Sequence, residues 1–297
     1  MPTFDGLVLS GGGVRGIAQL GALQYYSEQG VLKEDDVTVV AGTSVGALIG
    51  LLYVCGYHPL EIWSEIYNTE SLLSSSAGNT PILAALKNGG LMSVDTFVGK
   101  AEKMVSKKFG SVPTFMELHE KTGMIFIATA VNVNKGKVVY FSHTTHPDLN
   151  VISAVKMSCN LPFIFERITY QDEYHVDGGL LDNFPFEPVV PLAKNILGIL
   201  TPTDIESVQI NGLLTYFYEL IMIPITTLTK LRCRDLPDTM TMVEIKTSRS
   251  VTLQTSMTYQ EKMDFFVTGY DAAKKADMSP SVSPMGDGEW SVDWPDF

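Results

Sequence analysis

The chain has 297 residues, of which 45% are hydrophobic, and a formal net charge of −12 at pH 7. This length allows a large buried core in one or two domains, and the acidic balance argues against nucleic acid as a partner. The three cysteines, Cys55, Cys159 and Cys233, have no paired or metal-ligand spacing, so we expect reduced thiols and neither a metal nor another cofactor. With no signal peptide ahead of the first expected strand, we predict a cytoplasmic location.

The first expected elements are an apolar strand over residues 6–10 and a helix over residues 16–28, joined by a glycine-rich loop. The loop reads Gly11-Gly12-Gly13-Val14-Arg15-Gly16. Glycines let the backbone turn with positive φ and direct several N–H groups at one point, which makes a nest for an anion. Gly11, Gly13 and Gly16 also fit the G-x-G-x-x-G pattern of dinucleotide-binding proteins, so a pyrophosphate and an oxyanion are both candidate ligands.

A second apolar strand, expected over residues 37–41, leads into a sharp turn and a buried helix over residues 45–56. The turn reads Gly42-Thr43-Ser44-Val45-Gly46. A G-x-S-x-G sequence between a strand and a helix is typical of a nucleophile elbow, in which Gly42 and Gly46 provide the room that the turn needs. The hydroxyl of Ser44 then lies at a helix N-terminus, where negative charge is favoured. We predict Ser44 as a nucleophile, with a turn serine that caps a helix as the alternative.

The second strand also decides between the two ligands of the glycine loop. A dinucleotide site needs an acidic residue at the carboxyl end of this strand, but Asp35 and Asp36 precede the strand. The pattern therefore favours an oxyanion hole over a cofactor site. Because the two loops follow consecutive strands of a parallel sheet, we expect them to face one crevice.

The choice of a base for Ser44 is limited by the order of the chain. The candidate histidines are His58, His119, His143, His146 and His175. His58 lies at the far end of the helix that starts at Ser44, about 20 Å away at 1.5 Å per residue. Asp177 ends an expected strand over residues 173–176, and no histidine follows it, so it cannot belong to a triad of α/β-hydrolase order. Asp177, followed by Gly178 and Gly179, is the better candidate, with an ordinary Asp-Gly turn as the alternative.

The remaining periodicity predicts an α/β arrangement. Further strands are expected at 124–132, 137–142, 163–170 and 196–201, and helices near 59–68, 93–107 and 151–158. Residues 71–90 are rich in Ser, Gly and Asn, and predict either a cap over the crevice or an ordinary surface excursion. Residues 1–276 are expected to form one domain, and residues 277–297 a loosely ordered acidic tail.

Residues 211–231 form the most apolar stretch, and three cations, Lys230, Arg232 and Arg234, lie at its end. A buried or dimer-forming helix, an interfacial lipid-binding element and a membrane span are the alternatives. Glu219 and Pro224 count against a span. The cationic cluster predicts a docking edge for anionic lipid.

Taken together, the glycine loop, the elbow and the Asp-Gly-Gly turn resemble those of the patatin-like phospholipase family. A fourth segment, Ser158-Cys159-Asn160-Leu161-Pro162, is also similar. The resemblance covers roughly residues 4–200, and we recognise no pattern beyond about Asp204. In that family the glycine loop forms the oxyanion hole, the elbow serine is the nucleophile, and the aspartate completes a Ser–Asp dyad without histidine.

The resemblance implies a three-layer α/β/α sandwich with a mainly parallel central sheet. It implies a lipid acyl hydrolase that cleaves glycerophospholipids through Ser44 and Asp177, with N–H groups of Gly12, Gly13 and Val14 as oxyanion donors. Arg15 either supports the loop, attracts a lipid phosphate or forms a salt bridge on the following helix. The expected partners are membrane phospholipid or another lipid ester, with peripheral membrane contact. A non-catalytic member whose crevice binds lipid or a regulatory protein is the second hypothesis.

Overall fold

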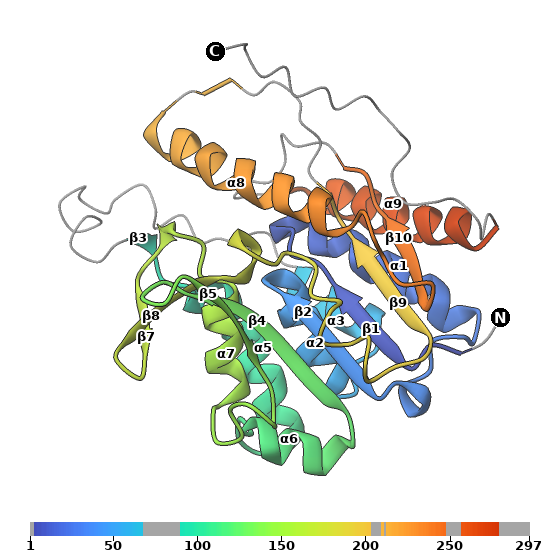
Figure 1. The fold of residues 1–297 in the computed structure, drawn as a ribbon. Helices are drawn as coiled ribbons and strands as arrows, with labels where there is room; N and C mark the ends of the chain where they lie inside the picture. Colours follow the sequence, from blue (N-terminus) through green and yellow to red (C-terminus); the bar gives the residue numbers. More distant parts are fainter. Residues whose placement is uncertain (1–2, 68–89, 203–208, 211, 248–256, 279–297) are drawn as a thin grey trace.

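The structure, a computed structural model, describes residues 3–67, 90–202, 209–210, 212–247 and 257–278. Its centre is an eight-stranded sheet of order β10-β9-β1-β2-β4-β8-β7, in which β5 also pairs with β4 (Figure 1). The strands of this sheet are β1 (Gly6–Leu9), β2 (Val39–Thr43), β4 (Ile125–Asn132), β5 (Lys137–Phe141), β7 (Ile168–Tyr170), β8 (Glu173–Asp177), β9 (Ile196–Leu200) and β10 (Met240–Glu244). A separate pair joins β3 (Gly90–Met92) to β6 (Phe163–Phe165).

The five neighbouring strands β10, β9, β1, β2 and β4 run parallel. The inner strands β9, β1 and β2 are buried at every residue, which explains why their sequences are almost wholly apolar. Successive side chains of a strand point to opposite faces. Leu7 and Leu9 of β1 accordingly enter the main hydrophobic core, while Val8 enters a second core on the other face. A sheet buried on both faces needs a covering layer on each side.

The helices supply most of these layers. They are α1 (Gly16–Glu28), α2 (Val45–Val54), α3 (Pro59–Ile62), α5 (Asp95–Phe109), α6 (Phe115–Thr122), α7 (Val151–Ser158), α8 (Leu213–Arg232) and α9 (Tyr259–Met278). Helices α1, α2, α5 and α7 lie over the main core, and residues 184–193 with the end of α8 cover the second core. The predicted three-layer α/β/α fold with a mainly parallel sheet is confirmed.

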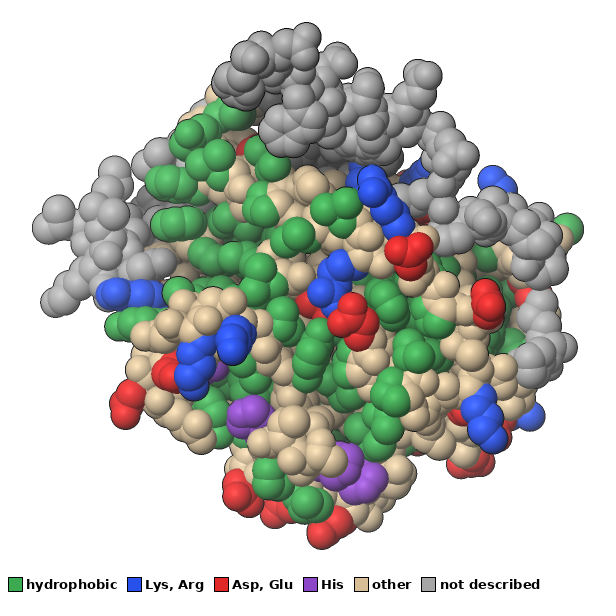
Figure 2. Space-filling view, in the orientation of Figure 1, with side chains coloured by type: hydrophobic (Ala, Val, Ile, Leu, Met, Phe, Trp, Pro, Cys, Tyr) green, Lys and Arg blue, Asp and Glu red, His purple; other side chains and the backbone are tan. Residues whose placement is uncertain are grey.

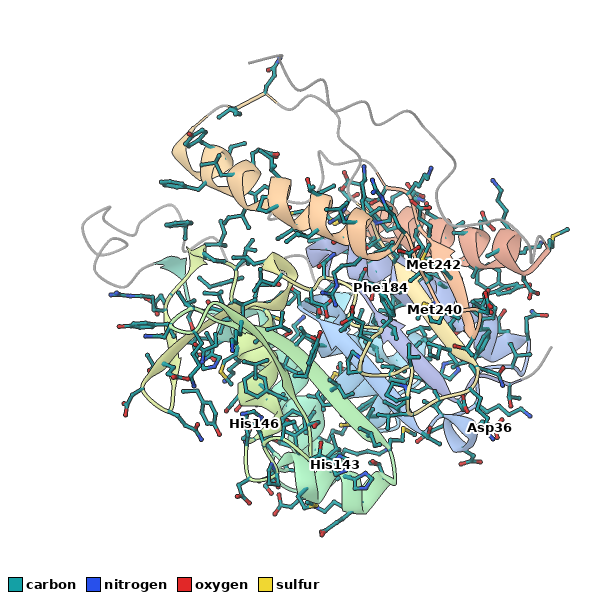
Figure 3. All side chains as sticks on the ribbon, in the orientation of Figure 1. Asp36, His143, His146, Phe184, Met240 and Met242 are labelled. Carbon is teal, nitrogen blue, oxygen red and sulfur yellow. The ribbon has the colours of Figure 1, made fainter. Side chains whose placement is uncertain are left out.

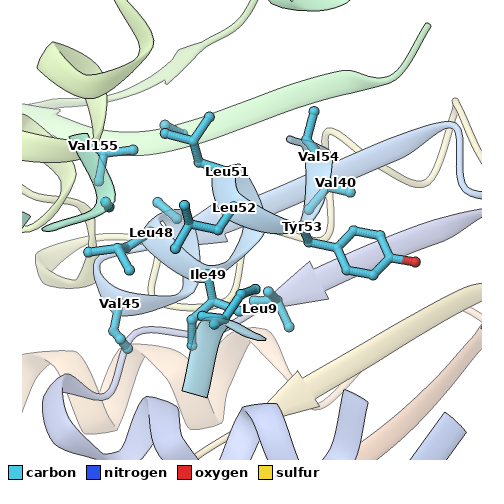
Figure 4. Close-up of a cluster of buried hydrophobic side chains, with 14 of the residues drawn as sticks. Leu9, Val40, Val45, Leu48, Ile49, Leu51, Leu52, Tyr53, Val54 and Val155 are labelled. Carbon is cyan, nitrogen blue, oxygen red and sulfur yellow. The ribbon is translucent and has the colours of Figure 1, made fainter. Parts of the chain in front are cut away.

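Helix α2 lies at the centre of the main core. Every one of its residues is buried, and its apolar side chains contact the sheet on one side and α7 on the other (Figure 4). A helix that is apolar all round must be enclosed, because no face of it can be turned to water without cost. The same enclosure fixes the position of Ser44, which directly precedes the helix.

Helices α1 and α9 cross at very close range through two glycines. A Cβ atom on Gly21 would lie 1.9 Å from the carbonyl oxygen of Phe266, and one on Gly269 would lie 1.7 Å from that of Ala18. Neither position accepts a larger residue without moving a backbone. Helix α9 and strand β10 thus complete the sandwich. Both lie beyond about Asp204, where the sequence gives no recognisable pattern.

Most expected elements agree with the structure within a few residues, and two differ. The strand expected over 163–170 is two strands, β6 and β7, and the helix expected over 59–68 is the short α3 followed by a π-helical turn, Trp63–Tyr67. The expected cap at 71–90 and the expected tail beyond α9 lie almost wholly outside the described residues. Among the helices that the structure does describe, none has the combination of length and apolar character required to cross a bilayer.

Candidate active site

The ends of two strands meet head-on along one edge of β4. Thr43 of β2 lies opposite Thr129 in parallel register, and Asp177 of β8 lies opposite Ala130 in antiparallel register. Because β5 occupies the other edge of β4 over Ala128–Asn132, β2 and β8 must share the remaining edge, one after the other. Ser44, which follows Thr43, is thereby brought to Asp177.

Ser44 lies in a strained backbone conformation, with φ of 55° and ψ of −125°. Such a turn directs the side chain away from the sheet at the N-terminus of α2, and it is typical of a nucleophile elbow. Both flanking glycines are required by close contacts. A Cβ atom on Gly42 would lie 2.4 Å from the carbonyl group of Gly46, and one on Gly46 would lie 2.3 Å from the carbonyl oxygen of Leu9.

Asp177 is buried, with 4% of its surface exposed, and the N–H of Gly179 donates a hydrogen bond to its Oδ1 at 2.8 Å. The Ser44 hydroxyl lies close enough to stabilise the charged carboxylate as well. Burial raises the pKa of Asp177 from 3.8 to about 6, against the opposite effect of these two groups. A carboxylate with this pKa is a better proton acceptor near neutral pH than a solvated one.

The glycine loop lies directly beside the elbow, since a Cβ atom on Gly11 would lie 3.3 Å from that of Ser44. Three of its N–H groups are used within the protein: Gly11 donates to Asn183, Arg15 to Gly12, and Gly16 to Gly13 and Val14. In the described part of the chain, no acceptor faces the N–H groups of Gly12, Gly13 and Val14. Gly12 and Gly13 are also partly exposed, and Gly13 has a φ of 57°.

A buried polar network holds the glycine loop in place from behind. Arg15 is 2% exposed, and it donates from Nε to the carbonyl of Gly12 at 3.1 Å and from Nη1 to that of Pro202 at 3.0 Å. The hydroxyl of Thr201 donates to the carbonyl of Gly11 at 3.1 Å, and Nε2 of Gln19 donates to that of Ser10 at 2.7 Å. These contacts favour the first of the three alternatives for Arg15, namely support of the glycine loop. The parts played by Gln19, Thr201 and Asn183 are invisible in the sequence, because they depend on distant segments.

In the described part of the chain, no histidine forms a hydrogen bond with Ser44 or Asp177. His119 and His143 stack on each other with ring centroids 4.0 Å apart, and His146 packs on Phe141. Figure 3 places His143 and His146 near α6, on the side of the view away from α8. His175 is buried on β8, where its Nδ1 contacts the carbonyl of Glu173 at 3.1 Å. These contacts give each of these four histidines a structural role.

Helix α8 lies over the site, in contact with β6 and with the turn that follows Asp177. Its Ile225 side chain would lie 3.6 Å from a Cβ atom on Gly179. The sequence predicts a cationic docking edge at the end of α8. This prediction is wrong for Arg232, because its Nη2 forms ion pairs with Asp182 at 3.2 Å and with Glu187 at 3.0 Å. Asp182 is fully buried and also accepts from the Tyr140 hydroxyl at 2.6 Å. Arg232 therefore joins α8 to the loop after Asp177.

A different part of α8 is exposed and apolar. Tyr216, Leu220 and Ile223 are exposed, and Phe163, which is 50% exposed, stacks on Phe217 at 4.7 Å. Figure 2 shows hydrophobic side chains gathered over the start of α8 and the region beside it. These residues, Phe163, Tyr216, Leu220 and Ile223, are called the apolar rim below.

Comparison with known proteins agrees with this architecture. The sequence model of the family described as patatin-like phospholipase matches residues 7–190, so this chain belongs to that family. The chain is 34% identical over 185 residues to a protein named probable lipid hydrolase 463L of Invertebrate iridescent virus 6, covering 62% of each chain. It is 32% identical over 199 residues to the uncharacterized protein YqhO of Bacillus subtilis (strain 168), covering 61% of this chain and 65% of that one. The match thus spans less than two thirds of the length of either relative.

Among solved structures, VipD from Legionella pneumophila has the same fold. The TM-score is 0.59 at 19% identity, with 93% of this chain and 67% of that chain covered. At this identity the similarity establishes the fold alone.

Proposed function

We propose that this protein is a lipid acyl hydrolase in which Ser44 is the nucleophile and Asp177 the general base. The observation that carries the proposal is the position of Ser44 next to the buried carboxylate of Asp177, beside the open N–H groups of the glycine loop. A nucleophile, a base and an oxyanion site are the parts that acyl transfer needs. Membership of the patatin-like phospholipase family supports the same reaction.

In the proposed mechanism, the Ser44 oxygen attacks the ester carbonyl carbon while its proton passes to Asp177. The carbonyl electrons move to the oxygen, and the resulting oxyanion accepts hydrogen bonds from Gly12, Gly13 and Val14. Each such donor is worth about 2.7–4 kcal/mol in well-studied enzymes. When the tetrahedral intermediate collapses, the proton on Asp177 goes to the departing alcohol, and the acyl group stays on Ser44. Water then attacks the acyl-enzyme, with Asp177 again accepting a proton.

We propose glycerophospholipids as the substrate class and the apolar rim as the surface that meets the lipid. The rim residues lie on α8 and beside it, next to the turn that follows Asp177. A lipid that enters from a bilayer would keep its acyl chain against apolar side chains on the way to Ser44. Side chains of this kind, when buried in a lipid interface, provide affinity that does not depend on the charge of the membrane. This suits a chain with a net charge of −12.

The proposal is tested with vesicles of mixed phospholipids, from which released products are identified by mass spectrometry. We expect free fatty acid and lysophospholipid from the wild-type chain, and neither from Ser44→Ala or Asp177→Asn. Ser153→Ala is a matched control, because Ser153 is exposed on α7. Binding of vesicles without any product would instead support a non-catalytic lipid-binding protein. Product release by Ser44→Ala at the wild-type rate would exclude Ser44 as the nucleophile.

A further inference from the structure

The end of α7 and the two residues after it contact both halves of the Ser44–Asp177 pair. We infer that Ser158, Cys159 and Asn160 form a clasp that positions Ser44 against Asp177; this inference rests on the proposed function. The clasp is defined by these three residues alone. None of them is proposed to react with substrate, and each acts through a contact with Ser44 or with β8, the strand that carries Asp177.

Ser158 holds the backbone of the elbow. Its Oγ accepts a hydrogen bond from the N–H of Ser44 at 2.9 Å and donates one to the carbonyl of Thr129 at 2.6 Å. The side chain is fully buried, so water cannot replace either bond. Ser158 therefore ties the strained turn at Ser44 to β4, at the residue opposite the end of β2.

Asn160 holds the other strand end. Its carbonyl accepts from the N–H of Asp177 at 2.9 Å, and its Nδ2 donates to the carbonyl of His175 at 2.9 Å. Because the two hydrogen bonds reach β8 at positions two residues apart, they fix both the position and the direction of the end of this strand. The side chain of Asn160 is 2% exposed, so these bonds also lie in the core.

Cys159 lies between these two residues in the chain, and its thiol is buried close to both Ser44 and Asp177. Burial and the charge of Asp177 raise the pKa of this thiol, while the Ser44 hydroxyl lowers it. Cys159 thus fills the space behind the pair as an uncharged thiol.

The topology explains why a clasp is needed. Strands β2 and β8 approach each other from opposite directions on one edge of β4, and their ends belong to segments far apart in the chain. A displacement of about 1 Å between reacting groups can cost a factor of a hundred in rate. The clasp is itself anchored, because Lys156 on α7 forms ion pairs with Asp95 at 2.8 Å and Glu102 at 2.9 Å on α5.

The experiment measures how fast, and to what final stoichiometry, a fluorophosphonate labels the full chain. In this reaction the Ser44 oxygen bonds to phosphorus, fluoride leaves, and the proton passes to Asp177. For Ser158→Ala we expect full stoichiometry with a rate constant lower by about tenfold to a hundredfold. Ser158→Cys, which keeps a weaker donor and acceptor, should fall between this variant and the wild type. The control Ser153→Ala should label like the wild type.

The folded fraction separates positioning from stability. Because labelling is irreversible and removes molecules from the folding equilibrium, a variant that is only destabilised still labels fully, at the wild-type rate multiplied by its folded fraction, which urea denaturation gives. A rate that falls no further than this fraction overturns the clasp. If Ser158→Ala does not fold, Ser158→Cys decides: a rate that falls further than its folded fraction supports the clasp, and a rate that does not overturns it. A wild-type chain that takes no label overturns the proposed function and the clasp together. A labelled wild type with equally fast variants overturns the clasp alone.

Discussion

The stability of the Asp177→Asn variant, measured relative to that of the wild type, should increase as the pH rises. Burial holds the pKa of this carboxyl at about 6, above its ordinary value of 3.8. The folded state therefore binds a proton more tightly than the unfolded state, and ionisation of Asp177 weakens folding. Asn cannot ionise, while its side-chain oxygen can still accept the N–H of Gly179.

The size and sign of the effect follow from the two pKa values. Below pH 3.8 the carboxyl is protonated in both states, and above pH 6 it is ionised in both. Between these values the stability of the wild type falls with rising pH, by about 3 kcal/mol in total for a shift of about two units at 1.36 kcal/mol each. About half of this loss, on the order of 1 kcal/mol, comes between pH 5 and pH 8. The difference in stability between Asp177→Asn and the wild type should grow by that amount.

Urea denaturation of both proteins at pH 5 and pH 8 provides the measurement. Comparison of the two pH values cancels any pH-independent effect of the substitution, such as a changed contact with Ser44. Asp172→Asn, an exposed position in the turn between β7 and β8, is the control for loss of one surface charge. A difference that stays constant, or shrinks, from pH 5 to pH 8 would contradict a raised pKa at Asp177. The Asn variant should be inactive at both pH values.

Three further predictions concern activity. Hydrolysis should decline as the pH falls through about 6, because protonated Asp177 cannot accept the Ser44 proton; a pH–rate profile flat down to pH 4.5 would argue against this base. Removal of a general base lowers the rate of hydrolysis about a hundredfold or more. Replacing any one of the five histidines with Ala should lower the initial rate far less than this. Changing Tyr216, Leu220 and Ile223 to Ser should lower vesicle binding at least about tenfold, since burying one Leu or Ile is worth about 1.5–3 kcal/mol. Turnover of a soluble short-chain ester should be spared, and Val267→Ser on α9 should change neither; equal losses on both substrates would exclude the rim as a docking surface.

The parts of the site that could be predicted from sequence are those encoded locally. The glycine loop and the elbow each lie between a strand and a helix that are adjacent in the chain, so a short pattern determines their form. Asp177 was predicted from the chain order and the family resemblance. Its approach to Ser44 through antiparallel pairing with β4 depends on long-range contacts that no local pattern contains.

The same reason explains what the sequence did not reveal. Arg232 has the appearance of a surface cation beside Lys230 and Arg234, but it pairs with the buried Asp182, fifty positions earlier. Ser158 and Asn160 stand out in the sequence only through the family resemblance, because their partners lie on β4, on β8 and in the turn after β2. Phe163, the first residue of β6, has a φ of 66°, an uncommon conformation for an aromatic residue that the sequence gives no reason to expect.

The central claim, that Ser44 is the nucleophile, is tested most directly by locating the covalent label. The wild-type chain is treated with a fluorophosphonate, digested, and mapped by tandem mass spectrometry, with Ser44→Ala treated in parallel. We predict a single modified site at Ser44 in the wild type and no modified peptide in Ser44→Ala. Modification of another residue, or undiminished labelling of the Ser44→Ala protein in its folded state, would contradict the account.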